Sequence, residues 1–361
     1  MKKTVSFAMA VVTVLYASLF CLVSTSCGDE NTLVVCNWGE YISDGTDGYM
    51  DVIAEFENQT GIRVEYVTAE TTEALYSLMK SGSVSYDVIF PSDYMAEKMI
   101  AEDMLAPLNF DNIPNIKNIL PEFMNLDYDP ENLYTAPYFW GTVGLIYNEE
   151  LINKEDLPLL EDCKDWSLLW SDRPEYKNKI MMFNNPRDAF GIAELQLGYS
   201  LNTHDEAELR AAAELLKQQK FCYYMDEFFE LMPSGGLAMA PYYAGDYLYV
   251  ASENEHLKFV IPECGTNLFN DVMCIPKTSK HKDLAEKFIN FMLDPEVGRN
   301  NTEYLGYSTP NGKVLEIMDE EMRQDPVAYP EPKKEWERYR DLGDETTEFM
   351  RDLWINVLGN N

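Results

Sequence analysis

The chain has 361 residues, of which 46% are hydrophobic, and it carries 62 acidic against 28 basic side chains, so its formal net charge at pH 7 is −34. Nucleic acids and anionic lipid headgroups are disfavoured as partners, because both are polyanions. The excess of acidic over basic residues favours cationic ligands only weakly, since a solubilising acidic surface explains most of this excess. The length is sufficient for two lobes that each have a core.

The N-terminal segment has the order of an export signal. A short basic start precedes the mostly apolar residues 5–23, and small residues then lead to Cys27. This order predicts a signal peptide over residues 1–26. It also predicts a lipid on Cys27, with residues 27–31 as the anchored N-terminus, although Ser24 stands where the lipoprotein motif usually has Leu. A plain anchored signal is the alternative. No later stretch has the roughly 20 apolar residues that span a bilayer.

The remaining cysteines indicate neither a disulfide framework nor a zinc site. They are odd in number and form no Cys-x-x-Cys pair. A Cys264–Cys274 bridge is left open, and the others are most simply buried small hydrophobic residues. The five are Cys36, Cys163, Cys222, Cys264 and Cys274.

Strand-like and helix-like segments then alternate along the chain. The first five are a strand over 32–38, a helix over 49–58 with Gly61 after its end, a strand over 64–67, a helix over 72–80 ended by Gly82, and a strand over 86–90. This β-α-β-α-β order predicts a parallel sheet flanked by helices. Further helices are predicted over 205–220, 282–293 and 346–358.

Two later strand-like runs, 137–148 and 271–277, are predicted to cross between two lobes. The first run contains glycines at which hinge dihedral angles could change. Neither lobe would then be continuous in sequence. The predicted division assigns residues 32–140 and 272–312 to lobe 1, and residues 141–271 and 313–361 to lobe 2. One long single-domain sheet is the alternative.

Six short segments carry aromatic residues, acidic residues or both, and most of them follow an apolar strand-like run. Ligands of open α/β sheets bind at the carboxyl ends of the strands. A pocket built from these ends would suit a flexible organic polycation, because carboxylates take ammonium groups and rings take methylenes and cation–π contacts. The segments are Trp38-Gly39-Glu40-Tyr41, Ser92-Asp93-Tyr94, Asn185-Pro186-Arg187-Asp188, Tyr243-Ala244-Gly245-Asp246, Phe269-Asn270-Asp271 and Leu305-Gly306-Tyr307.

Each of these residues is weak evidence when taken alone. An aromatic ring such as Trp38 or Phe269 is more often core than ligand wall. Asp188 and Asp246 could cap helices, and Arg187 is a natural ion-pair partner for a neighbouring acid. Glu40 and Asp93 could simply face solvent. Asp271 stands out, because an acid at the head of an apolar run is costly to bury without a partner.

The motifs of most enzyme classes are absent. The three histidines accompany no Gly-x-Ser-x-Gly and no His-Glu-x-x-His, and no Gly-x-Gly-x-x-Gly or P-loop follows a strand. Serine and zinc hydrolases and nucleotide-binding enzymes therefore have little support. The enzyme class that remains is a two-carboxylate glycosidase. We expect a binding protein rather than an enzyme, with no metal and no cofactor.

Over nearly the whole chain after the signal, the sequence resembles the polyamine (spermidine/putrescine) substrate-binding proteins of bacterial ABC importers. The order and spacing of several segments carry the resemblance. They are Asn37-Trp38-Gly39-Glu40-Tyr41, Tyr86 to Tyr94, Pro137-Tyr138-Phe139-Trp140-Gly141, Asp165 to Trp170, and Leu305 to Asn311.

The resemblance implies a two-lobed periplasmic-binding-protein fold of α/β class, type II-like, that closes on its ligand like a hinged clamp. It implies a monomer that is lipid-anchored at the periplasmic or extracellular face of a bacterial membrane and delivers a polyamine to a membrane permease. The aromatic box of the family falls here on Trp38, Tyr41, Tyr94, Tyr243, Phe269 and Tyr307, the ammonium-binding acids on Asp188, Asp246 and Asp271, and a hydroxyl contact on Ser92.

Two positions depart from the pattern of the family. Gly39 stands where relatives often carry a Ser, Thr or Asp, and Asn185 stands where spermidine-preferring members can carry an Asp. A further polar contact maps to Glu337 or to Tyr339. The choice between putrescine and spermidine is thus left open, and the alternatives are a sugar or Fe(III) receptor of the same fold, or the glycosidase.

Overall fold

The structure, a computed structural model, describes residues 31–359, and this part of the chain is a mixed α/β structure. The strands are β1 (Thr32–Trp38), β2 (Arg63–Ala69), β3 (Val88–Ile89), β4 (Thr135–Asn148), β5 (Met181–Phe183), β6 (Cys222–Tyr224), β7 (Met239–Tyr243), β8 (Leu257–Val260) and β9 (Leu268–Cys274). The helices are α1 (Val52–Thr60), α2 (Thr72–Ser81), α3 (Asp93–Ala101), α4 (Leu157–Glu161), α5 (Pro186–Leu197), α6 (Glu206–Leu216), α7 (Phe228–Leu231), α8 (Ala244–Ala251), α9 (Lys282–Met292), α10 (Pro295–Leu305), α11 (Gly312–Ile317), α12 (Glu320–Gln324) and α13 (Gly343–Leu358). Short 3-10 helices lie at Thr46–Gly48, Phe110–Asn112, Pro114–Asn118, Pro121–Phe123, Ser167–Trp170 and Pro174–Tyr176.

One large sheet has the strand order β2-β1-β3-β9-β4-β7, with β8 paired to β4, and a second small sheet pairs β5 with β6. β1 is parallel to both β2 and β3, as the β-α-β-α-β order predicts. The later strands are antiparallel: β9 is antiparallel to β3 and β4, and β4 is antiparallel to β7 and β8. These later strands enter the sheet through long connections that the local sequence pattern does not reveal.

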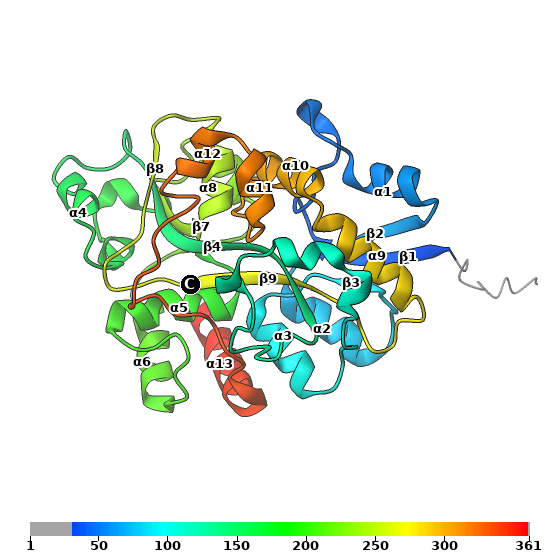
Figure 1. The fold of residues 1–361 in the computed structure, drawn as a ribbon. Helices are drawn as coiled ribbons and strands as arrows, with labels where there is room; N and C mark the ends of the chain where they lie inside the picture. Colours follow the sequence, from blue (N-terminus) through cyan, green and yellow to red (C-terminus); the bar gives the residue numbers. More distant parts are fainter. Residues whose placement is uncertain (1–30, 360–361) are drawn as a thin grey trace, which may run out of the picture. The chain divides into compact units, whose positions relative to one another are not determined.

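The strand β4 joins two groups of strands. Residues 135–142 pair with β9, whereas residues 143–148 pair with β7 and β8. Figure 1 shows β4 and β9 running between the β1–β3 region and the region of β7, β8 and α5. The glycines of β4 serve close packing in this structure: a Cβ at Gly141 would lie 2.8 Å from the Phe269 ring.

Local sequence signals place several elements well. β1 begins and ends where the sequence predicts. Gly61 and Gly82 end α1 and α2 in the left-handed conformation, with φ of 70° and 67°, which costs glycine little. The predicted strand over 86–90 is shorter, since only Val88–Ile89 pairs. The five cysteines in the described part of the chain are free, so the suggested Cys264–Cys274 bridge is wrong.

The buried apolar residues form three clusters. One draws mainly on residues 143–257 together with residues 339–357, at the β7 and α5 end of the sheet. The other two draw on residues 33–140 and 268–307, around β1, β3 and β9. Each end of the sheet therefore has its own core, and the fold has two halves. The predicted lobe boundaries stay a prediction.

Within residues 31–359, no helix combines the length and apolar character of a membrane span. The predicted signal peptide and Cys27 lie outside the described residues.

Candidate ligand-binding site

A cavity of about 440 Å³ lies between the two halves of the sheet. Its wall is built from the segments that follow β1, β2 and β3, from the starts of α5 and α8, and from β9. All ten residues that the sequence analysis assigns to a ligand site line this one cavity: Trp38, Tyr41, Ser92, Tyr94, Asp188, Tyr243, Asp246, Phe269, Asp271 and Tyr307. Their role in binding stays a prediction.

Carboxylates dominate the polar part of this wall. Eight acids line the cavity, and no Lys, Arg or His is among its lining residues in the described part of the chain. They are Glu40, Glu70, Glu73, Asp93, Asp188, Asp226, Asp246 and Asp271. Such a wall creates a strongly negative potential inside a space with little water, which attracts cations and repels anions.

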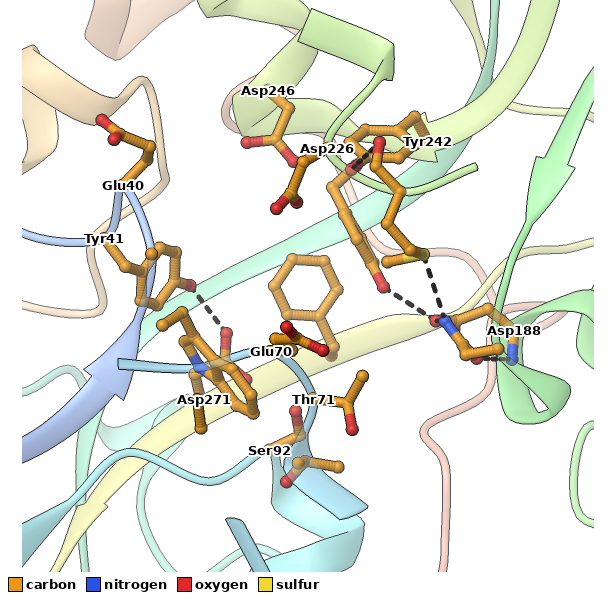
Figure 2. Close-up of a pocket in the computed structure, with 18 of the residues that line it drawn as sticks. Glu40, Tyr41, Glu70, Thr71, Ser92, Asp188, Asp226, Tyr242, Asp246 and Asp271 are labelled. Carbon is orange, nitrogen blue, oxygen red and sulfur yellow. Dashed lines mark hydrogen bonds between the residues drawn. The ribbon is translucent and has the colours of Figure 1, made fainter. Parts of the chain in front are cut away.

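Asp271 lies in the middle of β9, and its side chain faces the segment after β1. The hydroxyl of Tyr41 donates a hydrogen bond of 2.6 Å to its carboxylate (Figure 2). Burial raises the pKa of Asp271 to about 6, against the hydrogen bonds from Tyr41 and Ser92, which lower it. The expectation that this acid sits at the head of a strand is wrong, because β9 begins at Leu268.

Asp188 lies in the first turn of α5. The side chain of Asn185, which caps this helix, accepts a hydrogen bond from the Asp188 amide and donates one of 2.8 Å to its carboxylate. The hydroxyl of Tyr243 donates a second bond of 2.8 Å to the same carboxylate oxygen. Burial raises the pKa of Asp188. Asn185 is thus the cap and Asp188 is not, and an Asp at position 185 could not donate the bond that orients Asp188.

Asp246 lies in the first turn of α8 and is not its cap either, since the cap residue is Tyr243. Tyr307 donates a hydrogen bond of 3.0 Å to its carboxylate. The ring of Tyr307 packs so closely on this turn that a Cβ at Gly245 would lie 2.4 Å from it. Burial raises the pKa of Asp246 to about 7; the nearby charge of Asp226 adds to the rise, and the Tyr307 hydrogen bond opposes it.

Glu73 repeats this arrangement on α2, where Tyr94 donates a bond of 2.7 Å to it. Arg187 lies behind this wall, with its guanidinium 4.1 Å from the Tyr339 ring centre and 5.8 Å from that of Tyr94. The predicted ion pair of Arg187 with a neighbouring acid is absent from the described part of the structure, where its side chain donates to Leu201 and other oxygens. Arg187 thus makes no direct ion pair with Asp188, although its charge lowers the pKa of this acid and opposes part of the rise caused by burial.

Asp93 has a structural role. It is buried, and its two oxygens accept hydrogen bonds from the backbone N–H groups of Tyr94, at 2.8 Å, and Asn270, at 3.1 Å. Burial raises its pKa to about 7. The bond to Asn270 ties α3 to β9 beside Asp271. Asp93 thus holds the wall in place rather than facing solvent.

The aromatic part of the wall surrounds Phe269. Its ring makes edge contacts with Tyr243 and Tyr307, with centroids 5.5 and 6.3 Å apart. Tyr41 packs edge-on against Tyr307 at 4.9 Å, and Trp38 is half-buried at the end of β1. Such rings cover methylene groups and stabilise cations over their faces.

Sequence reasoning missed several lining residues. Glu70, Thr71 and Glu73 follow β2 as the predicted residues follow β1, so the same strand-end signal could have found them. Asp226 follows the three-residue strand β6, which has no clear sequence signal. Of the two C-terminal residues left open, Tyr339 lines the cavity and Glu337 does not.

Three of the lining acids, Glu40, Glu70 and Asp226, are exposed at the rim of the cavity. Their side chains make no hydrogen bond or ion pair with other residues of the described part. Glu40 has a φ of 49°, in the left-handed region that a non-glycine residue seldom adopts and that is enriched at functional sites. Among residues 31–359, no group of three or more acids, histidines or cysteines is arranged as a metal site.

The chain is similar to known bacterial binding proteins. A family model described as bacterial extracellular solute-binding protein matches residues 51–330. The spermidine/putrescine-binding periplasmic protein of Salmonella typhimurium is 32% identical over 324 residues, which cover 88% of either chain.

Solved structures agree with this result. A structure from Listeria monocytogenes described as a spermidine/putrescine ABC transporter superimposes with a TM-score of 0.84 at 38% identity, covering 92% of this chain and all of that one. The spermidine/putrescine substrate-binding protein PotD of Streptococcus pneumoniae gives a TM-score of 0.75 at 37% identity, covering 91% of this chain and 99% of that one. The similarity therefore extends over both halves of the fold.

Proposed function

The chain belongs to the family of bacterial extracellular solute-binding proteins, and we propose that it is the polyamine receptor of an ABC importer, which binds spermidine or putrescine outside the cytoplasm. It is a two-lobed binding protein and not an enzyme. Its partner in transport is the membrane permease of that importer.

The observation that supports this proposal is the composition of the cavity wall, where eight acidic residues and no Lys, Arg or His are among the described lining residues. Aliphatic amines resemble lysine, whose pKa is about 10.4, so a polyamine is a polycation at neutral pH. Ammonium groups would neutralise carboxylates that are otherwise costly to bury. A neutral sugar could accept hydrogen bonds from few groups here and would leave the charges of the wall uncompensated.

In the proposed complex, Asp188, Asp246 and Asp271 hold the ammonium groups, and Ser92 adds a hydroxyl contact. The methylene chain would lie between the aromatic rings of Trp38, Tyr41, Tyr94, Tyr243, Phe269 and Tyr307. The tyrosines that donate to the acids would fix the carboxylates in direction, so that little ordering remains for the ligand to impose.

Calorimetric titration of the protein starting after Cys27, with putrescine, spermidine and spermine, tests the proposal. We expect saturable one-to-one binding at micromolar affinity or tighter, and no heat with maltose, the matched neutral control. Absence of binding by protein shown to be folded and free of ligand would refute the receptor proposal and leave only the fold.

We also propose that the protein is a monomer anchored by lipid at Cys27. The order of the first 27 residues supports the anchor, as set out above. In cells supplied with labelled palmitate, the wild-type protein is expected to take up label and to sediment with membranes, whereas Cys27→Ser is expected to do neither. Light scattering of the soluble form tests the monomer, for which a mass near that of one chain is expected.

The lobe division proposed for closure has residues 32–140 and 272–312 in one lobe and 141–271 and 313–361 in the other. The strand β4, whose two parts pair with different strands, supports a crossing near residue 141. Small-angle scattering with and without spermidine tests it: a smaller radius of gyration with ligand supports closure, and no change opposes it.

A further inference from the structure

The three acids proposed to hold ammonium groups lie at three places in the cavity, each with its own hydrogen-bond donor. Asp271 is held by Tyr41, Asp188 by Tyr243, and Asp246 by Tyr307. Figure 2 shows the labelled carboxylates of Asp271, Asp188 and Asp246 on three different sides of the cavity. A flexible amine that neutralised all three would need three ammonium groups.

The third place differs from the others in its second carboxylate. Near Asp271 and Asp188 the second carboxylates are those of Asp93 and Glu73, which accept hydrogen bonds. The carboxylate of Asp226 near Asp246 has no such donor among residues 31–359. Figure 2 shows Asp226 beside Asp246, with both side chains at the same side of the cavity. The charge of Asp226 contributes to the raised pKa of Asp246, which shows that the two carboxylates interact. Asp226 makes no hydrogen bond or ion pair with its side chain among residues 31–359, so its charge is free to meet a ligand.

The turn that carries Asp226 is rigidly built. The hydroxyl of Tyr242 donates a hydrogen bond of 3.2 Å to the carbonyl of Met225, and the Met225 amide donates one of 3.2 Å to Glu227. The ring of Tyr242 is stacked on that of Phe228, with centroids 3.9 Å apart. Both rings are buried. These contacts position the backbone that carries Asp226 on the same side of the cavity as Asp246.

We propose that Asp226 is a specificity-determining residue, which together with Asp246 forms a subsite for a third ammonium group, so that the protein prefers a triamine to a diamine. The inference rests on the proposed function. A diamine has two ammonium groups and leaves one of the three places unneutralised. If that place is the one where the second carboxylate has no donor of its own, the charge left without a partner is greatest, and an unpaired carboxylate beside a buried one is costly.

Calorimetry with putrescine, spermidine and N-acetylated spermidine tests this inference. Acetylation keeps most of the length of spermidine but removes one ammonium group. We expect the wild-type protein to bind spermidine at least tenfold more tightly than putrescine, and at least one acetylated isomer to bind about as weakly as putrescine. Equal affinities for spermidine and putrescine would overturn the inference but leave the receptor proposal in place.

The variant Asp226→Asn removes the second carboxylate from an exposed position, so folding is expected to be unaffected, as a thermal melt would confirm. We expect a loss of about tenfold in spermidine affinity and less than threefold in putrescine affinity. The matched control is Glu230→Gln, which removes one charge from α7 without touching the cavity. It is expected to change neither affinity.

An equal loss for both ligands in Asp226→Asn, or the same loss in Glu230→Gln, would overturn the role of Asp226 in specificity. In either case polyamine binding itself would persist. Failure of the wild-type protein to bind any polyamine would instead refute the proposed function on which the inference depends, so the two failures are distinguishable.

Discussion

The substitution Asp271→Asn is expected to weaken polyamine binding and, at the same time, to stabilise the ligand-free protein. The carboxylate is buried, with Tyr41 as a hydrogen-bond donor, and no cation of the described residues lines the cavity. Asparagine has nearly the same shape and can still accept the bond from Tyr41 through its amide oxygen. The change therefore removes a charge and little else.

The size of both effects follows from the raised pKa. At pH below about 4 the carboxyl is protonated whether the chain is folded or unfolded, and it costs nothing. As pH rises through about 6, the folded protein must give up the proton in a buried place, and stability is lost. The rise of the pKa from 3.8 to about 6 corresponds to about 3 kcal/mol above pH 7. Loss of a buried charge partner of the ligand costs about 2–5 kcal/mol of binding free energy, which is at least tenfold in Kd.

Thermal melts at pH 7.5 and calorimetric titration with spermidine measure the two effects. We expect Tm of the ligand-free variant to rise by a few degrees, and the rise to vanish at pH 4. Wild-type affinity in a folded variant would remove Asp271 from the site. A lower Tm at pH 7.5 would show that the charge is stabilised by its surroundings, and the account of the raised pKa would be wrong.

Three further predictions follow from named groups. Between pH 7.5 and pH 5 the affinity for a polyamine is expected to fall by up to about a thousandfold, because Asp246 and Asp271, with pKa values of about 7 and 6, must lose protons to bind. Calorimetry in buffers of different ionisation enthalpy would detect the released protons. An affinity that does not change with pH would contradict the assignment of these two acids to the ligand site. Glu194→Gln is expected to raise Tm without changing the affinity for a polyamine. This acid is buried, neither of its side-chain oxygens has a hydrogen-bond partner among the described residues, and burial raises its pKa to about 8. A lower Tm in the variant would contradict this expectation. Glu97→Gln is expected to destabilise the protein by about 1 kcal/mol and to speed ligand release, because the carboxylate of Glu97 on α3 accepts three hydrogen bonds from the guanidinium of Arg340, ahead of α13. An unchanged Tm at low salt would exclude the effect on stability.

The parts of the fold that sequence predicts well are those set by local signals. The bounds of β1 and the ends of α1 and α2 depend on neighbouring residues, because a glycine in the left-handed conformation stops a helix wherever the helix lies. The order of β9 and β4 in the sheet depends on which distant segments pair. No local pattern specifies that pairing, so the antiparallel half of the sheet could not be predicted from the sequence.

The candidate site shows the same division. Residues at or shortly after the ends of predicted strands, such as Trp38 and Tyr94, were found because the carboxyl ends of strands meet at one edge. Asp226 was missed because β6 is only three residues long. The sequence also could not show that Asn185, and not Asp188, caps α5. Either residue type can cap a helix, and only the direction of the side chain distinguishes them.

The pairing of acids with tyrosines favours a polycation over a sugar as the ligand. In each of four pairs a tyrosine hydroxyl donates to a carboxylate of the cavity, which orients the charge but does not neutralise it. The pairs are Tyr41–Asp271, Tyr94–Glu73, Tyr243–Asp188 and Tyr307–Asp246. A sugar could share these oxygens but would leave every charge uncompensated in a cavity without lysine, arginine or histidine among its described lining residues. A ligand that brings its own positive charges relieves the cost that burial imposes on each acid. Affinity is thus expected to follow the number and spacing of ammonium groups more closely than the size of the ligand.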